Sequence, residues 1–195
     1  MRDGDGEPAG ALIFDTAIGA VGVAWTTRGL VALALPAASR EATRARLAEI
    51  TAPLGDHLDP PTWVVDAAAR ITAHLEGRVV DLATLPLDLD HASRFSREVY
   101  AITRAIPRGE VRTYAEVARA AGAPGAARAV GRAMADNPLP IVIPCHRVIA
   151  SGDGPGGFSA PGGLDTKARL LAIEGHLLAG TEQLHLSFRD TPRSN

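Results

Sequence analysis

The residue types best suited to covalent chemistry lie together in one short segment, NPLPIVIPCHRVIA at residues 137–150. It contains Cys145, the only cysteine of the chain, and His146 and Arg147 follow it directly. A thiol attacks as the thiolate, and cationic neighbours or a helix terminus lower its pKa from about 8.5 to about 7 or below. The pattern therefore predicts a reactive thiol that attacks an electrophilic carbon held in a dry pocket.

The same segment allows other roles for this cysteine. A free cysteine is most often a buried apolar residue, and the run at residues 141–143 predicts a buried strand that ends at Pro144. One cysteine beside one histidine supplies no tetrahedral ligand set, and the chain has no CxxC or HxxxH pattern, so we expect no metal and no cofactor. A protease-like pair is disfavoured, because the histidine of such enzymes usually lies far from the cysteine in sequence.

The composition is that of a globular chain, with 46% hydrophobic residues among 195. The chain has no run of about 18 apolar residues, so no membrane span is expected. The N-terminal segment MRDGDGEPAG lacks the pattern of a signal peptide, and we expect a flexible tail over residues 1–10. A lone cysteine forms no internal disulfide, which favours a reducing, cytoplasmic location.

The charge is distributed unevenly along the chain. Residues 1–92 hold 7 lysines and arginines against 13 aspartates and glutamates, whereas residues 93–178 hold 11 against 7. A basic half after an acidic half suggests two domains, of which the second faces a polyanion. Ordinary surface charge explains the same difference, so the charge alone leaves both interpretations open.

The first half predicts a mixed sheet and helix unit. Three β-rich runs between residues 11 and 36 favour an antiparallel meander. Helices are expected over residues 39–50, with Ser39 as the cap, and over residues 60–77, with Pro61 in the first turn and Gly77 as the stop. The second of these helices has one apolar face, formed by Val64, Ala68, Ile71 and Leu75. A further strand is expected over residues 82–90.

The second half predicts mainly helices. The first covers residues 93–106, and its apolar stripe consists of Phe95, Val99, Ile102 and Ile106. Thr113 and Glu116 have capping-box spacing at the start of the next helix, which ends at Gly122. A short turn and a helix over residues 126–136 follow, which makes a helix-turn-helix candidate. A last helix capped by Asp165 and a strand over residues 184–188 complete the prediction.

The helix over residues 126–136 is unusual for a groove-reading helix because most of its residues are small. Base readout in the major groove needs long polar side chains, and here Arg128 is the one that such a helix would project. A helix packed on all sides in a core would also be rich in alanine and glycine. The alternative is a helix pressed into a narrow groove, with Arg128 entering the base stack.

The segment over residues 95–175 strongly resembles the O6-alkylguanine-DNA alkyltransferases, also called methylated-DNA–protein-cysteine methyltransferases. The motifs that carry the resemblance are IPRGEVRTYAEVA, GAPGAARAVG, RAVGRAMADNP, IPCHRVI and GGFS, followed by the glutamate and glycine of EG. The sequence FDTAIGAVGVAW looks like the first domain of bacterial members.

The resemblance implies an α+β protein in two domains. A small antiparallel sheet with helices, ribonuclease H-like, would occupy residues 11–92. A mainly helical domain with a helix-turn-helix would occupy residues 93–178, and residues 179–195 would form a C-terminal tail.

It also implies a direct-reversal DNA repair reaction by a monomer. The protein would bind double-stranded DNA through the minor groove and flip the alkylated base outward, since sulfur cannot reach the attacked carbon inside the duplex. The alkyl group of O6-alkylguanine, or of O4-alkylthymine as a second substrate, would then move irreversibly to Cys145. Each molecule of this methyltransferase would react once, because a thioether does not hydrolyse.

The family roles carried over to the reaction itself fall on five residues. Cys145 would accept the alkyl group, and His146 would take the thiol proton through a water. Glu174 would orient His146, which is the order of a nucleophile, a base and an orienting group. Asn137 would hold the active-site turn, and Tyr114 would donate its hydroxyl proton to the leaving guanine.

The roles in binding fall on the surrounding residues. Arg128 would fill the hole left by the flipped base. The neighbouring contacts with DNA would come from Thr113, Ala126, Ala127, Ala129 and Gly131. The pocket for the base would be lined by Met134, Val148, Phe158 and Ser159.

Two departures from the family affect what is carried over. Many relatives have tyrosine where this chain has Phe158, so the pocket wall keeps its ring and loses a hydroxyl. The cysteine-based zinc site found in the first domain of some relatives is excluded by the single cysteine. The alternatives kept beside the repair hypothesis are a helix-turn-helix regulator with a reactive sensor cysteine and a cysteine-dependent hydrolase.

Overall fold

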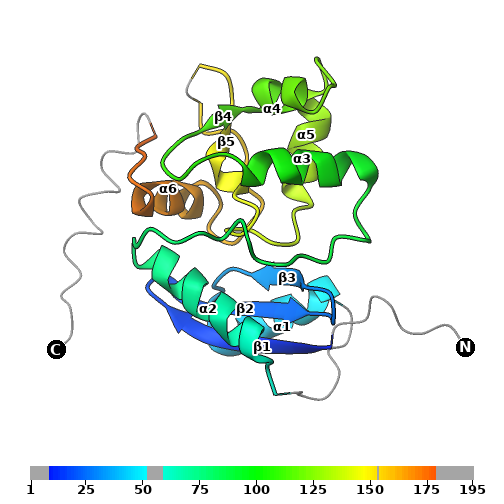
Figure 1. Ribbon diagram of the computed structural model, residues 1–195. Coiled ribbons are helices and arrows are strands. Elements are labelled where there is room, and N and C mark those ends of the chain that lie inside the picture. Colours follow the sequence, from blue (N-terminus) through cyan, green and yellow to red (C-terminus); the bar gives the residue numbers. More distant parts are fainter. Residues whose placement is uncertain (1–8, 52–58, 153, 179–195) are drawn as a thin grey trace, which may run out of the picture.

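The computed structural model describes residues 9–51, 59–152 and 154–178 (Figure 1). Its elements, in chain order, are β1 (Gly10–Thr16), β2 (Gly19–Trp25), β3 (Leu30–Ala34), α1 (Arg40–Thr51), α2 (Thr62–Leu75), α3 (Arg94–Arg104), β4 (Arg112–Thr113), α4 (Tyr114–Ala120), α5 (Ala127–Ala135), η1 (Cys145–Arg147), β5 (Val148–Ile149) and α6 (Gly163–Ile173). The α+β class is as expected. The predicted strand at residues 184–188 lies outside the described residues.

The first three strands form the expected antiparallel meander in the order β1-β2-β3. Successive side chains of a strand point to opposite faces, and β2 follows this rule. Val21, Val23 and Trp25 join the main core, whereas Ala24 packs with Leu47 of α1. Helix α1 therefore covers one face, and the other face packs on α2 and on the core of the second half (Figure 1).

The third strand connects the sheet to the rest of the molecule. The Leu30 amide donates to Pro86 O at 2.9 Å, and the Leu33 amide donates to Pro138 O at 2.7 Å. The strand predicted over residues 82–90 is wrong, because this segment makes a single bridge, between Leu30 and Leu87, and otherwise turns along the sheet edge. Its anchor is the buried carboxylate of Asp88, which Arg28 contacts at 3.0 Å.

The helices of the first half match their expected positions. The Ser39 hydroxyl accepts from the Ala42 amide at 3.1 Å at the start of α1. Pro61 directly precedes α2, and Gly77 ends the segment with a φ of 87°. The predicted apolar face of α2 is buried along its whole length. The tail was expected to reach residue 10, but Gly10 belongs to β1, and residues 1–8 lie outside the described part of the chain.

The first helices of the second half also follow the predicted pattern. Helix α3 buries Val99, and the capping box of Thr113 and Glu116 is present at the start of α4. Helices α4 and α5 pack on each other and on α3 (Figure 1). The turn between them passes through Gly122 and Gly125, both with positive φ, which glycine adopts without the steric cost of a Cβ atom.

One helix boundary differs from the prediction. Helix α6 begins after Gly162, which is left-handed with a φ of 79°, so Asp165 lies in the first turn and is not the cap. A Cβ atom at position 162 would lie 2.3 Å from the Thr166 hydroxyl. The helix stops before Gly175, as expected.

A continuous apolar core joins the two halves. It runs from Val23 and Leu33 of the sheet, through Ile71 of α2, to Val99 of α3 and Val142 beside the cysteine. Such continuity means that the active-site segment rests directly on the N-terminal sheet. No described helix is both long and apolar enough to cross a membrane.

Candidate active site

The segment before the cysteine is a tight turn and not the predicted strand. Its apolar residues 141–143 are buried as expected, but only one bridge, between Pro140 and Ile143, has strand geometry. Ile141 has a φ of 74°, the one positive value at a non-glycine residue among the described residues. A β-branched residue in this region is strained. The turn therefore holds an unfavourable backbone conformation just before Cys145.

Asn137 holds this turn together through its side chain. Its Nδ2 donates to Ile143 O at 2.8 Å, and its Oδ1 accepts from the Leu139 amide at 3.0 Å. The Cys145 amide in turn donates to Ile143 O at 2.7 Å. Asn137 lies two residues after the end of α5, so it links that helix to the position of the cysteine.

A short parallel strand pair brings Tyr114 to the cysteine. β5 follows the turn of residues 145–147 directly, and it pairs with β4, where Arg112 lies opposite Val148. Tyr114 is the next residue after β4, and its hydroxyl donates to Gly157 O at 3.4 Å. A Cβ atom at Gly156 would lie 2.8 Å from the Tyr114 ring. The loop therefore needs glycine at this position for the tyrosine to lie against it.

Cys145 and Tyr114 line a common cavity of about 280 Å³. Its other lining residues are Gly131, Met134, Ala135, Gly157, Phe158 and Ser159. The cysteine also borders a wider groove of about 570 Å³ that extends to β3 and α1. Of the residues expected to line the pocket for the base, Met134, Phe158 and Ser159 border this cavity, whereas Val148 does not.

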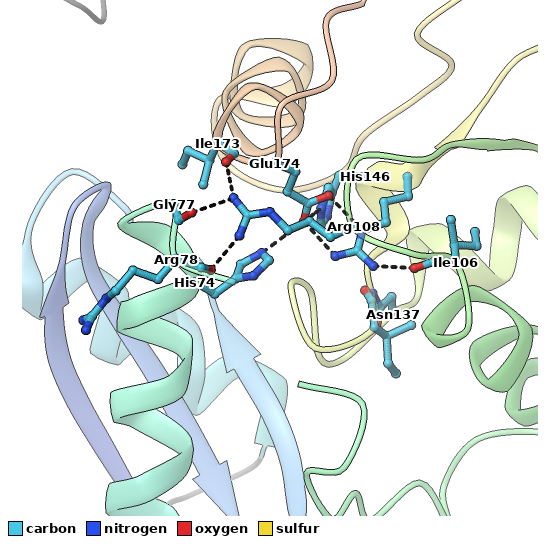
Figure 2. Close-up of polar contacts among 11 residues, drawn as sticks. His74, Gly77, Arg78, Ile106, Arg108, Asn137, His146, Ile173 and Glu174 are labelled. Atoms are coloured by element: carbon cyan, nitrogen blue, oxygen red, sulfur yellow. Dashed lines mark hydrogen bonds and ion pairs between the residues drawn. The ribbon is translucent and has the colours of Figure 1, made fainter. Parts of the chain in front are cut away.

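A buried group of charged and polar side chains surrounds Glu174, and it includes His146, the residue after the cysteine (Figure 2). Oε1 of Glu174 lies 2.9 Å from Nε2 of His146 and 3.0 Å from Nε2 of His74. Arg147 donates to both carboxylate oxygens at 2.8 Å and to Ile106 O at 2.6 Å. The predicted pair of His146 and Glu174 is therefore present, with Arg147 and His74 added to it.

The charge states of this group follow from its hydrogen bonds. Burial alone would raise the pKa of Glu174, but the bonds from His146, His74 and Arg147 hold that pKa well below its ordinary range. Burial lowers the pKa of His146, more than the adjacent carboxylate raises it. At neutral pH the pair is therefore an ionised carboxylate and a neutral imidazole.

This arrangement leaves one nitrogen of His146 as an acceptor. An ionised carboxylate only accepts hydrogen bonds, so Nε2 of His146 carries the proton. Nδ1 is then unprotonated, and it has no hydrogen-bond partner among the described residues. A buried imidazole with a free lone pair, backed by a carboxylate, has the properties of a general base.

The expected low pKa of the thiol is wrong. Burial raises the pKa of Cys145, and the Asn137 side chain and the charge of Lys167 do not offset it. His146 and Arg147, the cationic neighbours on which the expectation rested, direct their Nε2 and guanidinium groups to Glu174. The thiol is thus protonated at neutral pH, and a nucleophilic role for it requires a base.

Lys167 is a site residue that sequence analysis did not single out. It is fully buried, and its Nζ donates to Val148 O at 2.6 Å. Burial lowers its pKa to about 8, while Cys145 acts in the opposite direction. A signal for it was present, since it lies between GGFS and the glutamate and glycine of EG, two motifs that carry the resemblance. His74 had no such signal, because it lies in the first half of the chain.

Helix α5 has one buried face and one exposed face, so the interpretation as a core helix is wrong. Val130, Ala133 and Met134 are buried, whereas Arg128 is exposed and forms no hydrogen bond or ion pair with the described residues. The small residues beside it are half-buried, namely Ala126, Ala127, Ala129 and Gly131. The exposed side of the helix therefore offers backbone and small side chains around Arg128, with a second exposed cation, Arg132, one turn further along.

Ser159 and Val148, which were expected to contact the base, form hydrogen bonds within the protein. Ser159 is exposed, and its hydroxyl donates to Ala135 O at 3.1 Å. The Val148 carbonyl accepts from Lys167 and retains one lone pair. The described residues contain no group of three or more histidine, cysteine, aspartate or glutamate side chains that could hold a metal ion.

A buried thiol at a cavity, followed in sequence by a buried histidine with a free acceptor nitrogen, defines a site for chemistry on cysteine. The family model of the DNA-binding domain of 6-O-methylguanine DNA methyltransferase matches residues 94–176. The methylated-DNA–protein-cysteine methyltransferase of Mycolicibacterium paratuberculosis is 44% identical over 114 residues, which are 58% of this chain and 67% of that protein. The corresponding protein of Mycobacterium bovis is 38% identical over 134 residues, 68% of this chain and 79% of the relative.

Solved structures give the same relationship. The Mycobacterium tuberculosis OGT, crystallised in complex with DNA, aligns with a TM-score of 0.66 and 32% identity over 85% of this chain and 92% of that chain. This chain belongs to the family of methylated-DNA–protein-cysteine methyltransferases.

Replacement of Glu174 by glutamine should lower the free energy of unfolding at neutral pH by about 3–5 kcal/mol, because the buried charge of Arg147 loses its partner. A carboxylate with a depressed folded-state pKa stabilises fully above its unfolded pKa, and this stabilisation is lost as pH falls below about 4.5. Denaturant unfolding of the unaltered protein and the variant, at neutral pH and below about pH 4.5, measures the difference in their free energies of unfolding. A difference that stays constant into the acid range would contradict the assigned charge of Glu174.

Proposed function

We propose that this protein repairs alkylated duplex DNA by transferring the alkyl group of O6-alkylguanine to its own Cys145, once per molecule. The observation that carries the proposal is that the buried thiol lines a cavity with Tyr114, while the next residue, His146, pairs with buried Glu174. Relatives named methylated-DNA–protein-cysteine methyltransferase and a relative solved with DNA support the same function.

The proposed reaction moves one proton and one alkyl group. His146 takes the thiol proton at Nδ1 through a water, and the sulfur of Cys145 then forms a bond to the alkyl carbon. The bond between that carbon and O6 of guanine breaks as Tyr114 donates its hydroxyl proton to the leaving base. Burial raises the pKa of Tyr114, which keeps this proton available at neutral pH. The proton on His146 finally restores the tyrosine.

The base would occupy the cavity beside Tyr114. Its exocyclic amine would donate to the carbonyls of Cys145 and Val148, and Met134 and Phe158 would contact its faces. Ser159 would turn its hydroxyl from Ala135 O toward the guanine oxygen, which an exposed hydroxyl does by rotation of one bond. O4-alkylthymine is the proposed second substrate, because a cavity with this lining accepts a smaller base.

Helices α4 and α5 are the proposed helix-turn-helix, with α5 lying in the minor groove. Thr113 would contact a phosphate at the start of α4. The half-buried small residues of α5 let the backbone approach the groove closely, and Arg128 would fill the space left by the flipped base. Apart from Arg128 and Arg132, α5 has no long polar side chain, which disfavours the alternative of a sequence-reading regulator.

The other expectations extend this proposal. Residues 93–178 would bind DNA and accept the alkyl group, and residues 11–92 would form a ribonuclease H-like domain that supports them. The three-stranded meander with α2 on one face agrees with this fold. Action as a monomer, and in the cytoplasm, stay predictions.

Incubation of the full chain with duplex DNA that carries one O6-methylguanine should add one methyl group to the peptide that contains Cys145. The reason is that the thioether is stable and marks the acceptor atom. Mass spectrometry of the digested protein measures the product, and Cys145→Ala provides the control, which should bind the duplex and gain no mass. Repeated turnover of small esters without a mass change would instead support the hydrolase.

Replacement of Arg128 by alanine should slow transfer from duplex DNA about tenfold or more. The gap left by the flipped base then stays unfilled, and the lost base stacking costs a few kcal/mol. The rate with a single-stranded oligonucleotide that carries the same lesion should change little. Single-turnover rates on both substrates test this.

Arg132→Ala is the matched control for Arg128→Ala, since Arg132 is an exposed cation of the same helix. Equal losses in the two variants on duplex DNA would show that Arg128 contributes only charge.

A further inference from the structure

A second histidine reaches the carboxylate that backs the proposed base. His74 lies in the last turn of α2, 100 positions before Glu174, and its side chain is buried. Its Nε2 lies 3.0 Å from Oε1 of Glu174, the same oxygen that Nε2 of His146 contacts at 2.9 Å (Figure 2). The first half of the chain thus contributes a polar contact to the group behind Cys145.

The position of His74 is fixed by a second set of contacts. The guanidinium of Arg108 donates to the carbonyls of Gly77 and Arg78 just after α2, at 3.0 and 2.6 Å. It also donates to the carbonyl of Ile173, the residue before Glu174 (Figure 2). One side chain therefore ties the end of α2 to the end of α6, where His74 and Glu174 meet.

Proton counting determines how the three partners share the carboxylate. Glu174 is ionised and only accepts, so both histidines must present a protonated Nε2 to it. Arg147 supplies the remaining donors, one to each oxygen. Oε1 thus accepts three hydrogen bonds and Oε2 accepts one. A carboxylate held from several directions at once has little freedom to rotate.

We propose that His74 is a positioning residue for alkyl transfer, which shares Glu174 Oε1 with His146 and thereby fixes the carboxylate and the imidazole behind Cys145. The proposal rests on the function proposed above. It gives the first half of the chain a defined part in the reaction, because a residue of α2 completes the set of donors around the carboxylate.

Loss of His74 should change the basicity of His146 as well as its orientation. The charged and titratable groups that face His146 are Glu174, Arg147 and His74, whereas Lys167 acts on Cys145. Without the donor from His74, Oε1 carries more charge toward His146 and favours the imidazolium. The base is then available only at higher pH, so the acid limb of the rate profile should move to higher pH.

Two variants of His74 separate the donor from the bulk of the ring. Glutamine places its side-chain nitrogen the same number of bonds from the backbone as Nε2 of histidine, so His74→Gln retains a donor to Oε1. His74→Ala removes the donor. Leu75→Ala is the matched control, since Leu75 is equally buried in the same turn and provides no polar contact.

The experiment measures single-turnover methyl transfer from an O6-methylguanine duplex to the full chain, over about pH 5 to 8, the range in which histidine titrates. His74→Ala should lose about tenfold in rate, a part of the about 10²–10⁴-fold that a general base supplies. The acid limb of its rate profile should move to higher pH. His74→Gln should restore both the rate and the position of the acid limb. Leu75→Ala should lower the melting temperature and leave the limb in place.

Two results would overturn the proposal. One is an acid limb of His74→Ala that coincides with that of the unaltered protein, and the other is a shift of equal size in Leu75→Ala. Failure of the proposed function gives a different result, because the unaltered protein would then transfer no methyl group to Cys145 in the same assay.

Discussion

The buried carboxylate of Glu174 is the interaction on which the rest of the site depends. A charge removed from water is retained only when its environment replaces the lost hydration. Here Arg147 and two histidines do so, and together with Glu174 they come from three separate parts of the chain. Because burial of a charge without partners is unfavourable, α2, α6 and the turn of residues 145–147 must meet at this point.

The position of the charge also determines what the cysteine needs. Because His146 and Arg147 direct their donors to Glu174, they do not activate the thiol directly, and burial keeps Cys145 protonated. Activation of the thiol therefore requires His146. Its Nδ1 is free to accept a proton because its Nε2 carries the ring proton and donates it to Glu174. The strained turn at Ile141, held by Asn137, places the thiol at the cavity.

Sequence reasoning predicted the parts of this account that depend on local pattern. The meander, the capping box at Thr113 and the apolar face of α2 follow from periodicity and capping chemistry, and the resemblance supplied Tyr114 and Glu174. The pattern at residues 141–143 could not reveal a turn, because an apolar run is compatible with strand and turn alike. The contact of His74 with Glu174 could not be predicted either, since it depends on how two distant helix ends meet.

The tautomer of His146 tests the central claim most directly. Nitrogen chemical shifts of the unalkylated full chain at neutral pH distinguish the protonated from the unprotonated ring nitrogens, and the variant His146→Gln assigns the signals. The account predicts a neutral ring with a proton on Nε2 and none on Nδ1. A proton on Nδ1 at neutral pH, in either the other neutral tautomer or the imidazolium, would contradict the role of Glu174 as the group that fixes the tautomer of His146.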